Sequence, residues 1–189
     1  SSFSSWLTVD TAAGESYSYV MFNLMGSPVT EELQIYKAYS TLKGFKFGLD
    51  FTAFSNPTAF TQTLDFEGPI AMPAIRTGQL SYTHEVYPTN FVTLSIEDIN
   101  PGITGPTATT YSVNPVPAVV LKVTSSAKHY ELELAGIYRH ITARDTGDET
   151  YDQNLDGGGG SFTAMFKLFE ADMFKTGYIY GQGVSSIYQ

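Results

Sequence analysis

The sequence predicts an all-β fold, an antiparallel up-and-down transmembrane β-barrel to which the chain contributes about ten strands. The first observation is period-two alternation, as in residues 45–53, where every second residue is apolar. The second is the alternation of short turns, such as Lys43-Gly44, with long connections rich in glycine and proline, such as residues 98–117. Outer-membrane barrels show this asymmetry, because one end carries short turns and the other long loops.

Composition is the third observation. Of the 189 residues, 42% are hydrophobic and only 15% are charged, below the roughly 25% of soluble domains. The length fits one domain. No stretch reaches the roughly 18 apolar residues that a spanning helix needs, which argues against a helical membrane protein. The chain has no cysteine, which excludes disulfides and thiolate metal sites. Its net charge of −9 argues against nucleic acid as a partner, because phosphate binding needs a basic face.

Each expected strand lies between turn-forming residues. The strands are residues 3–10, 17–25, 33–42, 45–54, 79–86, 91–98, 119–125, 130–142, 162–171 and 176–183. The short connections lie at Ala12-Ala13-Gly14, Lys43-Gly44, Pro88, Ala127-Lys128 and Asp172-Met173. Most strands separate an apolar from a polar face, whereas residues 17–25 are apolar on both faces and receive no assignment.

A soluble β-sandwich would also alternate, so it remains an alternative. Two features favour the membrane. The strands approach the roughly nine to eleven residues of a tilted membrane strand. Several also carry an aromatic residue near one end, as an interfacial girdle does. These aromatic residues are Tyr17, Tyr39, Phe45, Tyr82 and Tyr130.

The direction of the strands predicts that the chain is part of a larger barrel. The first turn, near Gly14, is short, so the first strand runs towards the short-turn end. Strictly alternating strands then bring both termini to the long-loop end, whereas complete outer-membrane barrels are expected to begin and end on the short-turn side. We therefore expect further strands before and after these, in a barrel of about sixteen strands that leaves an aqueous channel.

An ordered series of short motifs resembles the DcaP-like porins. The motifs are Leu33-Gln34-Ile35-Tyr36-Lys37-Ala38-Tyr39, Gly48-Leu49-Asp50-Phe51-Thr52-Ala53-Phe54, Leu64-Asp65-Phe66-Glu67-Gly68-Pro69, Arg76-Thr77-Gly78-Gln79-Leu80-Ser81-Tyr82, Val116-Pro117, Ala135-Gly136-Ile137-Tyr138-Arg139 and Tyr180-Gly181-Gln182-Gly183. The resemblance spans most of the chain. It implies a homotrimeric channel in the outer membrane of a Gram-negative bacterium, passing small hydrophilic solutes and contacting membrane lipid or lipopolysaccharide.

The candidate functional residues are those that would line the channel. Alternation predicts an inward set of both charges, Lys46, Asp50, Glu85, Glu97, Lys122, Glu131, Glu133, Arg139 and Lys167. Residues 55–75 form a long loop that could fold into the channel and narrow it. Asp65 and Glu67 would then be acidic constriction residues, with Arg76 a basic one at the loop's exit. Alternatively, Phe66 anchors the loop and Asp65 caps a turn.

This chain departs from the family pattern at three inward positions. The DcaP-like porins tend to carry arginine where this chain has Gln34, Tyr36 and Ser81. The resemblance implies preference for anions or dicarboxylates, but the net charge of −9 favours a nonselective or weakly cation-preferring pore equally.

An acidic, glycine-rich segment, residues 145–160, is expected to be an external loop. Within it, Asp152, Asn154 and Asp156, followed by Gly157, have the oxygen spacing of the first half of an EF-hand loop. The closing acid is missing, because Thr163 stands at the twelfth position, and the flanks are strands. A solvated surface loop is therefore the main interpretation and a Ca²⁺ site a secondary one; no other cofactor is expected.

The sequence thus predicts a passive diffusion porin. The alternative is a non-channel outer-membrane barrel with a structural or partner-binding role. No local motif combines a serine, a histidine and an acid, so we expect no enzymatic activity.

Overall fold

A computed structural model describes residues 2–27, 30–59, 75–99, 110–113, 116–145, 152–169 and 172–184. The elements are β1 (Ser2–Thr11), β2 (Gly14–Ser27), β3 (Thr30–Leu42), β4 (Phe45–Phe51), the 3₁₀ turn η1 (Pro57–Ala59), β5 (Arg76–Tyr87), β6 (Asn90–Asp98), β7 (Thr110–Val113), β8 (Ala118–Ala127), β9 (Tyr130–Asp145), β10 (Asp152–Lys167) and β11 (Met173–Gln182). Within the described residues, no helix is long and apolar enough to cross a membrane.

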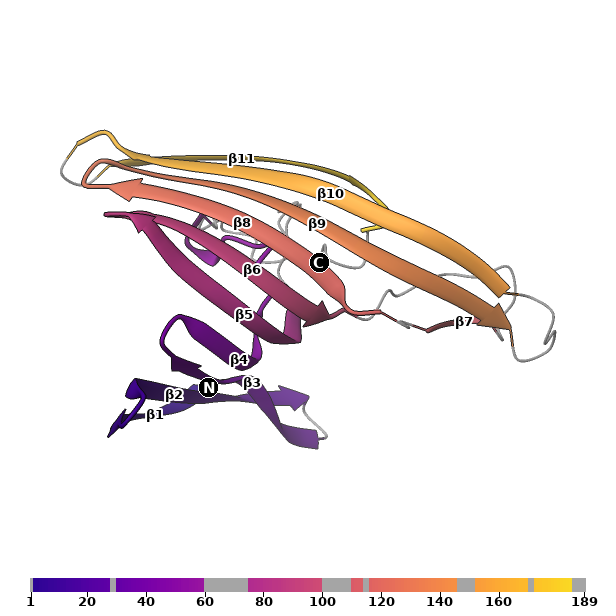
Figure 1. The fold of residues 1–189 in the computed structure, drawn as a ribbon. Helices are drawn as coiled ribbons and strands as arrows, with labels where there is room; N and C mark the ends of the chain where they lie inside the picture. The colour runs from indigo at the N-terminus through magenta and orange to yellow at the C-terminus, as the bar shows by residue number, and fades with distance from the viewer. Residues whose placement is uncertain are drawn as a thin grey trace.

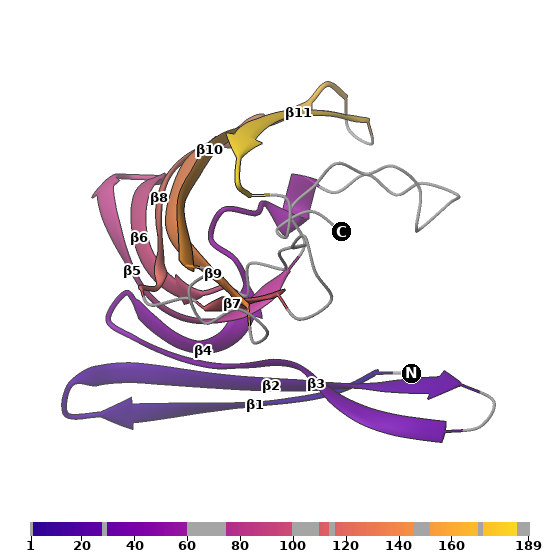
Figure 2. The same cartoon turned by 90° about the vertical axis from the view of Figure 1, so that its right-hand side faces the viewer.

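The strands form one antiparallel up-and-down sheet (Figure 1). Its order is β1-β2-β3-β4-β5-β6-β8-β9-β10-β11, and β7 pairs separately with the end of β9. Figure 2 shows β4 to β11 bent into an arc, with the η1 segment on the concave side. The predicted all-β, up-and-down barrel architecture is therefore confirmed.

At one end of the sheet Ser27 of β2 pairs with Thr30 of β3, so the connections at that end are not all long. The tight turns at residues 12–13, 43–44, 88–89 and 128–129 lie at the other end. Hydrogen bonds join neighbouring turns there: Thr83 N donates to Gly44 O at 2.8 Å, and Ser126 N donates to Thr89 O at 2.9 Å. Lys43 and Gly44 both have positive φ, 49° and 84°, as a two-residue type I′ turn requires. This turn fixes the register of β3 against β4, pairing Leu42 with Phe45.

The two faces of the sheet have opposite polarity, and the polar face is the covered one. In β6, Thr93, Ser95 and Glu97 are buried on the concave side, whereas Leu94 and Ile96 on the convex side are 50% and 46% exposed. Soluble domains bury their apolar face instead. Lipid on the outside and a polar interior explain this inversion, which disfavours the soluble-sandwich alternative.

β9 and β10 extend into the segment predicted to be an external loop, so that loop is mostly absent. β9 continues to Asp145 and β10 begins at Asp152, so most of residues 145–160 is strand. The glycines that favour a loop instead permit close backbone approach: a Cβ on Gly159 would lie 2.9 Å from Tyr180 O. The prediction of a long glycine-rich loop here is wrong.

We expect Leu121→Arg to destabilise the folded protein, because Leu121 lies on the convex face and is 52% exposed. A cation placed on the lipid-facing side of a barrel near the midplane costs about 2–4 kcal/mol. Urea unfolding from lipid vesicles measures this loss. Thr124→Arg, on the concave side of the same strand, is the control and should have little effect. Equal destabilisation by both variants would contradict the assignment of faces.

Candidate functional site

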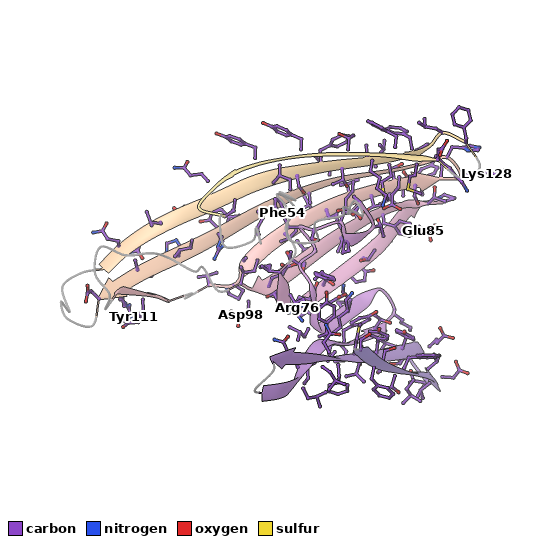
Figure 3. All side chains as sticks on the ribbon, turned by 180° about the vertical axis from the view of Figure 1, so that it is seen from behind. Phe54, Arg76, Glu85, Asp98, Tyr111 and Lys128 are labelled. Atoms are coloured by element: carbon purple, nitrogen blue, oxygen red, sulfur yellow. The ribbon has the colours of Figure 1, made fainter. Side chains whose placement is uncertain are left out.

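The chain turns inward after β4 and crosses the concave face as residues 52–59, a segment called here the strap. Phe54, only 1% exposed, anchors it in an apolar cluster. The cluster members from the inner wall are Ala118, Val120, Ala135 and Ile137, and Ile99 and Val184, which follow β6 and β11, also belong to it. Figure 3 places Phe54 between the end of the sheet that carries Tyr111 and the end that carries Lys128. The strap therefore lies within the arc of strands.

The root of the strap is held by the buried carboxylate of Glu97. Thr52 Oγ1 donates to Glu97 Oε2, and Ala53 N donates to Glu97 Oε1 at 2.7 Å. Ser55 N also donates to Thr52 O at 3.1 Å, which tightens the turn. Hydrogen bonds to a charged acceptor are among the stronger ones. Glu97 therefore fixes the point at which the chain leaves the wall.

The tip of the strap reaches the far strands. Asn56 Nδ2 donates to Thr163 Oγ1 on β10 at 3.0 Å, and Thr58 Oγ1 lies 3.0 Å from Glu131 Oε1 on β9. Lys175 Nζ on β11 donates to Thr58 O at 2.7 Å. Because both ends are hydrogen-bonded, the strap is a fixed bridge across the concave face.

Of the predicted constriction loop, residues 55–75, the structure describes residues 55–59, which lie on the concave face, and residue 75; the constriction itself stays a prediction. Asp65 and Glu67 lie outside the described residues, so their constriction role stays a prediction. Arg76 lies where β5 begins, with its guanidinium 4.2 Å from the centre of the Tyr36 ring. Its Nη1 also donates to Tyr36 O at 3.4 Å. Arg76 thus clamps β3 at this position.

A group of charged side chains lines the inner wall beside the strap. Lys37 Nζ and Lys46 Nζ lie 3.0 and 2.9 Å from the two oxygens of Asp50. Lys122 Nζ lies 3.4 Å from Glu133 Oε2. These lysines and Asp50 border a polar pocket of about 160 Å³, which Gln79, Ser81, Thr83 and Thr93 also line. We call this the lysine pocket.

Lys37 is the residue of this pocket that sequence reasoning missed. β3 contains a bulge, because Met21 pairs with Lys37 while the next residue, Phe22, pairs with Ile35. Tyr36 is therefore the extra residue, and the alternation changes phase there. The tight turn between β3 and β4 predicts the face of Lys37. Lys46 pairs with Thr41, so the two side chains share a face, and alternation along β3 places Tyr39 and Lys37 on the same face as Thr41.

Two predicted lining residues face inward but are covered. Glu97 is 0% and Arg139 2% exposed, and Arg139 Nη2 donates to Ile99 O at 3.4 Å. Both are covered by the inner segments that they hold, so their predicted pore-lining role stays a prediction. Alternation along a strand predicts which face of the sheet a side chain lies on, but it does not predict whether another segment covers that side chain.

The remaining predicted lining residues lie towards the turn end or at the strap. Figure 3 shows Glu85 near the turn end with Lys128. Glu85 and Lys167 are both exposed, and Lys167 N donates to His129 O in a neighbouring turn. Glu131 binds the tip of the strap, as described above. Any effect of Glu85 and Lys167 on conduction is therefore expected at the rim.

The residues proposed for Ca²⁺ do not form an EF-hand loop. Asp152, Asn154 and Asp156 lie in β10, where alternate residues are about 6.6 Å apart and the backbone cannot wrap around an ion. Asn154 Oδ1 accepts a hydrogen bond from Thr142 Oγ1, and Asp156 Oδ1 accepts one from the Tyr138 hydroxyl and lies 2.8 Å from His140 Nδ1. Among the residues that the structure describes, no three histidines, acids or cysteines form a metal-binding group.

Comparison with known proteins agrees with this geometry. A family profile described as "Porin subfamily" matches residues 3–189. Among solved structures, the outer membrane channel DcaP of Acinetobacter baumannii superposes with a TM-score of 0.81 at 18% identity. The match covers 95% of this chain and 51% of that one, so the chain spans about half of its length. No curated protein sequence matches.

We expect Glu97→Ala to loosen the root of the strap. Thr52 and Ala53 would lose a charged acceptor, and hydrogen bonds of this kind contribute about 1.5–3 kcal/mol each. Hydrogen exchange followed by mass spectrometry should show faster exchange across residues 52–56. Glu85→Ala, which removes an exposed carboxylate from β5, is the control. Unchanged exchange in Glu97→Ala would show that the apolar cluster alone holds the strap.

Proposed function

Because the chain belongs to the porin subfamily, whose profile spans residues 3–189, we propose that it forms part of the wall of an outer-membrane porin. The porin is a water-filled channel for passive diffusion of small hydrophilic solutes. It lies in the outer membrane of a Gram-negative bacterium; the solved channel DcaP, which shares its fold, is an outer membrane channel. Its work requires a polar conduit and no catalytic group.

The observation that carries this proposal is the polar concave wall. Each of β4, β5, β6, β8, β9 and β10 turns polar or charged side chains to the concave side, including Lys46, Gln79, Ser95, Lys122, Glu133 and Thr163. The convex side is apolar and exposed. An arc with this polarity leads water and solutes along its inside while lipid covers its outside. The strap crosses this inside and narrows the route.

The lysine pocket supports weak charge selectivity. Lysine, aspartate and glutamate alternate on the wall, and the described carboxylates Asp50 and Glu133 each contact at least one lysine. Paired charges cancel much of each other's field at a distance. We therefore propose a pore that is nonselective or slightly cation-preferring, for solutes small enough to pass beside the strap.

The apolar cluster favours the alternative function. Phe54 and Val184, each 1% exposed, pack on the inner wall where an open channel would hold water. If these inner segments close the passage, the protein is a non-channel barrel with a structural or partner-binding role.

We expect single-channel conductance when the purified full-length protein is added to a planar lipid bilayer. Under a KCl gradient the reversal potential should lie near zero or show a slight cation preference, because the wall charges are paired. A silent bilayer would favour the non-channel alternative, and a strong anion preference would contradict the proposed selectivity.

The proposed partners follow from the two faces and the family. The convex apolar side chains would contact membrane lipid or lipopolysaccharide, and the resemblance to the DcaP-like porins implies a homotrimer. Native mass spectrometry of the detergent-solubilised protein should give three copies of the full-length chain. A monomer under mild detergent conditions would refute the trimer.

A further inference from the structure

We propose that Asp50 is a built-in counter-anion that sets the ion selectivity of the channel by occupying the position that an anionic solute would take between Lys37 and Lys46. The inference rests on the proposed porin function. It assigns Asp50 the role of a specificity-determining residue, one that cancels an anion preference which the lysines of this wall would otherwise produce.

The geometry of the contact is that of a bound carboxylate. Each oxygen of Asp50 is used by a different lysine: Oδ1 lies 3.0 Å from Lys37 Nζ, and Oδ2 lies 2.9 Å from Lys46 Nζ. The two lysines come from β3 and β4, so the wall presents their ammonium groups together. A carboxylate or phosphate from solution would need these same donors and would have to displace Asp50.

Aromatic rings would keep the lysines on the wall without Asp50. Lys37 Nζ lies 4.6 Å from the centre of the Phe51 ring, and Lys46 Nζ lies 5.6 Å from the centre of the Tyr39 ring. Both distances allow a cation–π attraction. The side chains are partly covered, 23% exposed for Lys37, which limits screening by salt. Loss of the carboxylate therefore leaves two positioned cations facing the pocket.

Asp50 neutralises more of the positive charge at the lysine pocket than the neighbouring carboxylate, Glu133, does. Glu133 neutralises Lys122 alone, whereas Asp50 contacts two lysines. All three lysines border the same pocket of about 160 Å³. That volume exceeds the roughly 30 Å³ occupied by a water molecule several times over, so a small oxyanion fits. Removing the charge of Asp50 would leave Lys37 and Lys46 as an anion-binding pair.

The test compares Asp50→Asn, Asp50→Glu and the triple variant Lys37→Met/Lys46→Met/Asp50→Asn in planar bilayers, with the full-length protein. The reversal potential under a KCl gradient gives the ratio of anion to cation permeability. Asp50→Asn should raise this ratio roughly threefold relative to the wild type, because one unit of positive charge is released within the channel. Inorganic phosphate should also interrupt the single-channel current of this variant more often.

The controls separate the pair from a general charge effect. Asp50→Glu keeps the carboxylate and should behave as the wild type. The triple variant lacks both ammonium groups and should show neither the anion preference nor the phosphate interruptions. The inference is overturned if Asp50→Asn conducts with unchanged selectivity, or if the triple variant equals it in both measurements. Absence of conductance in the wild type would instead refute the proposed function, and the inference with it.

Discussion

The structure depends on one constraint: a single layer of strands must satisfy lipid on one face and water on the other. Backbone hydrogen bonds within the sheet satisfy the peptide groups, which lipid cannot do. The side chains then divide by position, so that Leu94 and Ile96 face outward while Ser95 and Glu97 face inward. Every later feature, from the strap to the lysine pocket, uses the inward half of this alternation.

The inward face of the sheet both contacts water and holds the segments of chain that fold over it. Buried charged groups are costly unless they are paired or hydrogen-bonded, and Glu97 meets this condition through Thr52 and Ala53. Inward polar side chains that would contact water in a wide, empty barrel therefore anchor a segment of chain where one folds over them. A polar residue lines the channel if no such segment covers it and holds the segment if one does, and residues of both kinds lie only a few positions apart.

The sequence was sufficient for the fold and for the inward face of most strands, because period-two alternation and turn residues are local signals. Three things needed the structure. The bulge at Tyr36 changes the phase of β3 and brings Lys37 inward, which simple alternation does not show. The burial of Glu97 and Arg139 depends on segments distant in sequence. The glycines of residues 157–160 have the composition of a loop, but they form a strand because the chain around Gly181 and Val184 packs directly against them.

The bulge also has a consequence for how this wall can evolve. Residues 37–42 are held in phase by the tight turn that joins them to β4, whereas residues 30–35 follow the register of β2. Deletion of Tyr36 would remove the bulge and leave both groups on their present faces, because the pairs Met21–Lys37 and Phe22–Ile35 would then follow each other in regular register. Loss of this one residue would thus straighten β3 and remove the ring and carbonyl that Arg76 contacts, while leaving Lys37 where it is.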